Sequence, residues 1–384
     1  MKSIYFLTIV LLVFALGQPC AHAQSGSDAS SGNTNQSWTA TTQQQLPSNQ
    51  NPTRTSETRT ESGGRTIDDQ SMQAMGTDGR YDPYLDVQKE TVKVDATTTR
   101  TVERTFGRDS EGRKTLVQVT EEEIRTLPGG EVKVVRTTSD PDANGALQPV
   151  QRETQDTRKL SPNVQETRST ILTASPNGGL TPSLQTTDRE TKTGDRNVEF
   201  HKSTSLPDSN GNWQLSEVKE GTIKDDGKDR TKEERVLRPG TDGNLSVVER
   251  TVSKESENAA GERRETVATY STNLPGTPVD DSLHLNQEVT TVHRKAADGV
   301  QSTQTLVEQR NPAEPSDGLQ VTQEAIDIVR PGSSGTTRET QTLESLDSNG
   351  ELGVVSVDTR KQDNTPAVHV DIAPAKTPQP APAH

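Results

Sequence analysis

The sequence has few of the residues that build a large hydrophobic core. Only 3% of its 384 residues are aromatic and 27% are hydrophobic, and the mean hydropathy is −0.87. A buried aromatic side chain removes roughly 150–250 Å² from water, so a deeply cored enzyme depends on many of them. The composition therefore excludes a large globular enzyme.

Cysteine is almost absent as well, and the single residue, Cys20, lies in an N-terminal leader. This leader has the basic Lys2, an apolar stretch over 4–16 and the small-x-small sequence 21–23, which predicts a signal peptide over 1–23. Pro19 precedes Cys20 where a lipidation signal needs a small residue, so soluble export is favoured over lipidation. The mature protein would then be periplasmic or extracellular, without disulfides and without a transmembrane segment.

The chain also lacks a block of basic charge. It has 42 Lys and Arg against 56 Asp and Glu, a net charge of −14, and the two signs alternate along the sequence. Proteins that neutralise nucleic-acid phosphates carry a basic stripe or patch. Nucleic acid is therefore not an expected partner.

Both ends of the mature chain have the composition of disordered segments. Residues 24–75 are rich in Ser, Thr, Gln, Asn and Gly, and 364–384 are rich in Pro and Ala. Such segments bury too little apolar surface to offset the entropy that ordering costs. The sequence predicts a disordered linker over 24–75 and an extended tail over 364–384.

The middle of the chain, 76–363, repeats with a period of about 33 residues. Glycines recur at this spacing, with Asp281 in one glycine position: Gly79, Gly112, Gly145, Gly178, Gly211, Gly243, Gly318 and Gly350. The residue two positions later is usually apolar: Tyr81, Lys114, Leu147, Leu180, Trp213, Leu245, Leu283 and Leu352, with Leu319 one position early. A fixed period of 20–50 residues is typical of repeat architectures.

Each half-repeat predicts a β-strand. The runs of 10–13 residues are rich in Thr and Val, and Asn-Gly turns such as Asn144-Gly145 connect them as in tight hairpins. The sequence therefore predicts an all-β fold, an elongated antiparallel β-hairpin repeat array of about eight hairpins with disordered termini. A duplicated but disordered segment is the alternative.

The alternation of apolar residues changes phase within some runs. In the run from Leu319, apolar residues fall on 319 and 321 and later on 326 and 328. A β-bulge changes the phase in this way, and so does a segment that is not a strand.

An outer-membrane barrel also consists of repeated hairpins, but its lipid face needs alternating apolar residues. Runs such as 151–158 would place charges in lipid, so the barrel is rejected. An open array has an exposed edge strand at each end, which predicts end-to-end self-association.

No catalytic or cofactor motif is present, and the chain is predicted not to be an enzyme. One turn resembles the start of a calcium loop: Asp140, Asp142 and Asn144 place oxygen atoms at alternate positions before Gly145. Gln151 stands where the bidentate Glu belongs. A hairpin turn in which Asp and Asn bind their own backbone is the favoured alternative.

The sequence predicts an exported, non-catalytic repeat protein. It would act as a structural spacer or as an interaction or adhesion surface in the cell envelope or outside the cell, with a partner there. Two alternatives stay open: a largely disordered, solvating envelope protein, and a weak calcium-dependent adhesive module.

Overall fold

The described residues consist of antiparallel β-strands and the turns between them. The structure, a computed structural model, describes residues 36–45, 52–272, 282–311, 318–332, 336–347 and 350–363. Twenty strands form one sheet. Within these residues, no helix is long and apolar enough to cross a membrane.

The strands follow the order of the chain. The first ten are β1 (Gln36–Gln45), β2 (Thr53–Ser62), β3 (Arg65–Met75), β4 (Tyr81–Lys93), β5 (Thr98–Arg108), β6 (Lys114–Thr126), β7 (Val132–Pro141), β8 (Leu147–Ser161), β9 (Val164–Ala174) and β10 (Leu180–Lys192). The others are β11 (Val198–Pro207), β12 (Trp213–Asp225), β13 (Asp229–Pro239), β14 (Leu245–Glu257), β15 (Arg263–Ser271), β16 (His284–Lys295), β17 (Gln301–Arg310), β18 (Leu319–Pro331), β19 (Thr336–Leu346) and β20 (Leu352–Asp363).

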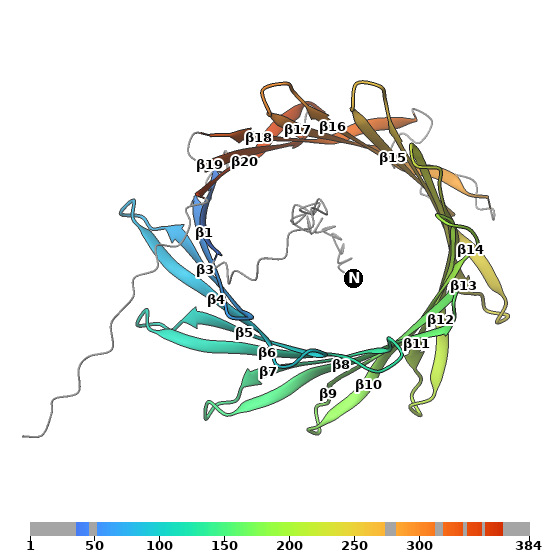
Figure 1. The fold of residues 1–384 in the computed structure, drawn as a ribbon, viewed down its shortest axis with the longest axis horizontal. Coiled ribbons are helices and arrows are strands. Elements are labelled where there is room, and N and C mark those ends of the chain that lie inside the picture. The colour runs from blue at the N-terminus through green and yellow to red at the C-terminus, as the bar shows by residue number, and fades with distance from the viewer. Residues whose placement is uncertain are drawn as a thin grey trace, which may run out of the picture. The chain divides into compact units, whose positions relative to one another are not determined.

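The sheet closes on itself, because the first strand pairs with the last. Each strand pairs with its neighbour in sequence, and β1 also pairs antiparallel with β20, Thr42 opposite Arg360. Figure 1 shows the result as a ring of strands viewed down its axis. A closed sheet has no free edge at which another copy could add a strand.

The described glycine turns that enter even-numbered strands share one geometry. In the turn before β8, the Asp142 nitrogen donates to the Ala146 oxygen at 2.8 Å and the Gly145 nitrogen donates to the Asp142 oxygen at 2.9 Å. Gly145 has φ of 81°, which residues with a side chain rarely adopt. The 33-residue period is thus one hairpin, with its glycine fixed by turn geometry.

A β-bulge follows each of these turns. The register of β8 against β7 shifts between Thr138 and Ser139, and equivalent shifts occur in the other even strands from β4 to β20. In β18 the shift skips Thr322, directly after Val321. The phase change in the sequence after 321 is therefore a bulge in a continuous strand.

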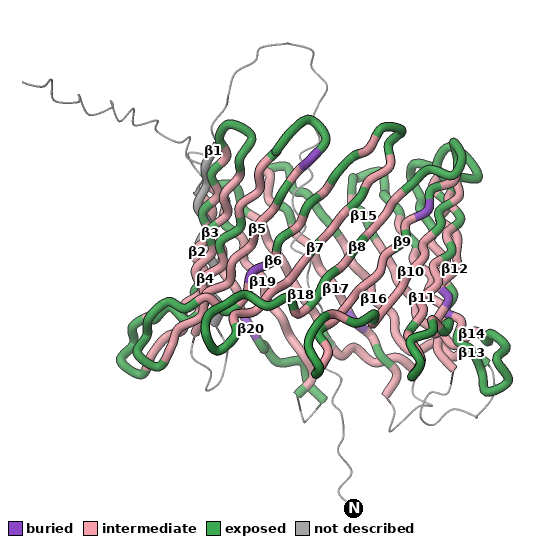
Figure 2. Tube along the Cα trace, turned by 90° about the horizontal axis from the view of Figure 1, so that it is seen from below, coloured by how far each residue is buried: buried purple, intermediate pink, exposed green. Residues whose placement is uncertain are grey.

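Very little of the barrel is buried. Val119, Val218, Val236 and Val307 are the buried hydrophobic residues in the described part, and Figure 2 shows that most of the wall is half-buried or exposed. The backbone ladders and cross-strand side-chain pairs, each contributing roughly 0.2–1 kcal/mol, therefore stabilise the sheet.

The all-β prediction of antiparallel hairpins is confirmed, but three expectations differ from the structure. The barrel was rejected from side-chain polarity, whereas strand pairing closes the sheet. The open edges from which end-to-end self-association was predicted are absent, because β1 pairs with β20. The segment 24–75 was predicted as a linker, yet it supplies β1, β2 and β3, whose Thr- and Ser-rich residues pair along their length. Residues 1–23 and 364–384 lie outside the described residues.

Closure can be tested by cross-linking β1 to β20. Ala40 and Gln362 are directly opposite in the register, so Ala40→Cys/Gln362→Cys in a Cys20→Ser chain should form an intramolecular disulfide on mild oxidation. The measurement is faster migration on a non-reducing gel. Ala40→Cys with Thr340→Cys, on the next strand but one, serves as the control that should not cross-link; an open array would leave both pairs reduced.

Candidate functional site

The candidate functional site is the polar wall of the barrel. Strand register divides its side chains into two faces, because alternate residues point to opposite sides and directly opposed residues share a side. One face carries Thr101, Glu122, Arg136 and Glu153, which are successive cross-strand partners. The other face carries the residues between them.

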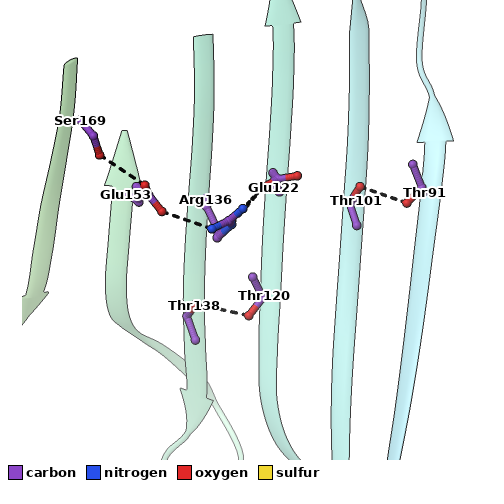
Figure 3. A network of polar contacts seen from close by, with 8 residues as sticks. All are labelled: Thr91, Thr101, Thr120, Glu122, Arg136, Thr138, Glu153 and Ser169. Atoms are coloured by element: carbon purple, nitrogen blue, oxygen red, sulfur yellow. Dashed lines mark hydrogen bonds and ion pairs between the residues drawn. The ribbon is translucent and has the colours of Figure 1, made fainter. Parts of the chain in front are cut away.

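The first of these faces lines the inside of the barrel. Figure 3 views the sheet from the side to which the labelled side chains point, with the even strands running upward. In this view, β4 to β9 follow one another from right to left. An observer inside the ring of Figure 1, facing its lower wall with the same strands upward, sees the same order. We call this the lumen face and the opposite one the outer face.

A charged network crosses four strands of the lumen face. Arg136 on β7 donates to Glu122 on β6 (Nε to Oε2, 2.9 Å) and to Glu153 on β8 (Nη1 to Oε2, 3.3 Å). Ser169 on β9 donates from Oγ to Glu153 Oε1 at 3.3 Å. Figure 3 shows these side chains in one row. One guanidinium thus serves two carboxylates, which leaves the cluster with an excess of negative charge.

Threonine pairs hold the same face between the charges. The Oγ1 atoms of Thr91 and Thr101 are 3.1 Å apart, and those of Thr120 and Thr138 are 3.3 Å apart. Across the barrel, Thr291 and Thr305 form an equivalent pair at 3.2 Å. The lumen face is therefore lined by hydroxyl groups and charges over widely separated strands.

The outer face carries ion pairs as well. Arg100 contacts Glu121 at 3.1 Å, and Glu166 lies between Arg158 at 3.3 Å and Arg168 at 2.8 Å. A shallow hollow on this face spans β4 to β6 and is lined by Glu90, Val92, Val94, Arg100, Val102, Arg104 and Glu121. Both faces of the wall are therefore charged.

The residues of the candidate calcium loop occupy two different environments. Asp142 accepts hydrogen bonds from the nitrogens of Asn144 and Ala146 at 2.8 and 2.9 Å, whereas the Asp140 carboxylate accepts one from Gln118 Nε2 at 3.1 Å. Among the described residues, no three His, Cys, Asp or Glu side chains cluster as metal ligands would. The turn has the geometry of the structural alternative, and calcium binding stays a prediction.

Sequence reasoning missed the lumen network of Glu122, Arg136 and Glu153. These residues are 14 and 17 positions apart and belong to no motif. Only the strand register makes them neighbours, so no local signal could have identified them.

The fold is similar to that of known barrels. The siderophore receptor PirA from Acinetobacter baumannii matches 88% of this chain and 81% of its own, with a TM-score of 0.50 and 7% sequence identity. PirA from Pseudomonas aeruginosa gives a TM-score of 0.46 at 11% identity over 88% and 81%. OccK5 (OpdH) from the same organism gives 0.43 at 7% over 86% and 97%. No family model matches the chain, and no curated protein matches it in sequence.

The similarity to PirA from Acinetobacter baumannii, together with the closed sheet, corrects the functional prediction. A spacer or adhesion surface, a secreted repeat protein and a disordered envelope protein all presuppose an open or unfolded chain, whereas this chain shares the closed barrel of a siderophore receptor. Barrels of this class cross the outer membrane with their strands. The prediction of no transmembrane segment was based on the lack of a long apolar run, which a membrane-spanning β-strand does not need. That prediction is wrong for this fold. Export to the cell envelope agrees with it.

The turn carboxylates predict loss of stability in acid. Backbone N–H donors hold the pKa of Asp142, Asp208 and Asp242 below the usual range. With a lowered folded-state pKa, this stabilisation is complete above the unfolded value of about 3.9 and is lost as pH falls through the folded value.

The variant Asp142→Asn/Asp208→Asn/Asp242→Asn keeps an acceptor in each turn but removes its titration. Thermal unfolding followed by circular dichroism between pH 2 and 7 should show a smaller decrease in acid than for the parent. An Asp78→Asn control should follow the parent, and equal acid sensitivity of all three proteins would contradict the assignment.

Proposed function

We propose that this protein is an outer-membrane barrel whose lumen passes hydrophilic solutes. The observation that carries the proposal is the closure of twenty strands around a face lined by threonine and charged residues. The similarity to a siderophore receptor supports the fold on which the proposal depends. Catalysis is not part of this proposal.

The number of strands makes the lumen wide. At about 4.8 Å between strands and a tilt of about 40°, a ring of twenty strands is roughly 40 Å across. Barrels of sixteen to eighteen strands already enclose an aqueous channel, since side chains cannot fill the interior. Hydrated solutes rather than one tightly bound ligand are therefore the proposed cargo.

The charge of the lumen face predicts the preferred solutes. Among the described, paired residues, Asp and Glu outnumber Lys and Arg on this face by twenty to fourteen, and the outer face has the opposite excess, fifteen acidic to twenty-two basic. A pore lined by one sign of charge concentrates ions of the other sign. The lumen should favour cations.

The outer face sets a condition on this proposal. An Arg or Lys that faces lipid at mid-membrane costs about 2–4 kcal/mol. The outward charges must therefore stay paired, as Arg100 is with Glu121 and Glu166 is with Arg168, and lipid contact must concentrate where the outer face is apolar.

Pore formation can be measured directly. The purified full chain, added to a planar bilayer in KCl, should produce stepwise increases in current, because each inserted barrel adds a wide water-filled path. The heat-unfolded chain is the control and should give none. Absence of steps from the folded protein, in bilayers where a porin inserts, would contradict the proposal.

Ion selectivity tests which face lines the pore. Under a KCl gradient the parent should show a reversal potential of the sign expected for K⁺ preference. Glu103→Gln/Glu122→Gln/Glu153→Gln, all on the lumen face, should move that potential toward zero. The matched outer-face variant Glu288→Gln/Glu308→Gln/Glu344→Gln, at sites outside the ion pairs named above, should leave it unchanged. Equal shifts in both variants would show that the faces are assigned wrongly.

A further inference from the structure

An apolar collar surrounds the outside of the barrel at one rim. It consists of the first two outward positions of the even strands, directly after the glycine turns: for example Leu147 and Pro149 in β8, Trp213 and Leu215 in β12, and Leu352 and Val354 in β20. The bulge follows the second position in each strand. The apolar residue that recurs after each turn glycine in the sequence is therefore the first collar position.

The pattern holds around the ring. The second position is apolar in every even strand from β4 to β20, from Pro83 through Leu116 and Leu285 to Val354. The first position breaks it at Lys114 in β6. The outward positions between the collar and the opposite rim are less consistently apolar, since they include ion pairs such as Arg100 with Glu121.

Four of the six aromatic residues whose side chains are described belong to the collar or lie directly opposite it. Tyr81 and Trp213 are at first positions, and Phe106 and Tyr270 lie directly opposite the second positions Leu116 and Leu285. Aromatic side chains with a polar edge favour the boundary between lipid and water. Their gathering at one rim points to that boundary.

The collar is exposed. Leu147, Leu215, Leu245 and Val354 have 45, 42, 42 and 44% of their surface accessible. A monomer in water seldom leaves so many large apolar side chains uncovered along one rim. Because the belt runs around the outside of a closed ring, a compact protein could cover only an arc of it, whereas a fluid lipid leaflet surrounds it completely.

Positive charge lies at the next outward position beyond the collar. Arg104, Arg152, Arg235 and Arg250 occupy it on four strands, and the acidic residues Asp86, Glu288 and Glu324 occupy it on three others. Guanidinium groups bind phosphate oxygens, and long basic side chains beside an apolar belt reach for lipid headgroups. The four arginines therefore supply phosphate-binding groups beside the collar.

We infer that the collar seats this rim of the barrel in a lipid leaflet, with the adjoining arginines on lipid phosphate groups. The inference rests on the proposed outer-membrane function and specifies which part of the wall contacts lipid. Two rows of side chains, about 7 Å apart along a strand, form the contact.

The experiment is flotation of the full chain with vesicles of phosphatidylglycerol and phosphatidylcholine. Leu147→Glu/Leu245→Glu should reduce the vesicle-bound fraction at least tenfold, because it places charge in the apolar belt at sites exposed enough to keep the fold. The matched control is Val94→Glu/Leu160→Glu, whose residues are 59 and 46% exposed at the opposite rim and should float like the parent. Circular dichroism checks that both variants remain folded.

A second readout locates the contact. In a Trp38→Phe chain, the fluorescence of Trp213 should shift to shorter wavelength on adding vesicles and should be quenched by brominated lipid. The inferred lipid contact would be overturned if all variants floated alike, if vesicles left the Trp213 emission unchanged, or if the parent only self-associated. Current steps in a planar bilayer report separately on the pore, so loss of the collar and loss of the pore are distinguishable.

Discussion

The pairing of β1 with β20 is the constraint on which the rest of the structure depends. Without it, the hairpins would form a sheet with two faces equally open to water and two unpaired edges. Once β1 pairs with β20, one set of alternating side chains points into the ring and the other set points away from it. Closure requires little from a hydrophobic core: four valines are buried in the described part, and backbone ladders with cross-strand polar pairs hold the wall.

Two periodicities of the chain meet in this wall. The 33-residue period sets one hairpin and places a glycine of positive φ in the described turns into even strands, as at Gly145. The two-residue period then sorts side chains between the faces. The bulge changes the phase of the second period after the second collar position in each even strand from β4 to β20, so that the collar is apolar and the wall beyond it is charged.

The lumen network and the collar explain why a chain of such low hydropathy can have a membrane-related function. Polar residues such as Arg136 and Glu122 are suited to a wide aqueous interior, where charges remain hydrated. Apolar residues are few, yet they are concentrated where a bilayer would meet the barrel. The ion pairs on the outer face, including Arg100 with Glu121, mark the part of the wall for which lipid is the less favourable surrounding.

The β-hairpins, their period, their turns and the phase change after Val321 could be read from the amino-acid sequence, because these follow from local propensity and turn chemistry. The sequence did not reveal that Thr- and Ser-rich residues before 76 form strands, or that Arg136 lies between Glu122 and Glu153. Closure and the identity of the inner face become visible in the folded chain alone. Both depend on pairing between residues more than 300 positions apart, such as Thr42 and Arg360, and local sequence carries no record of such a pair.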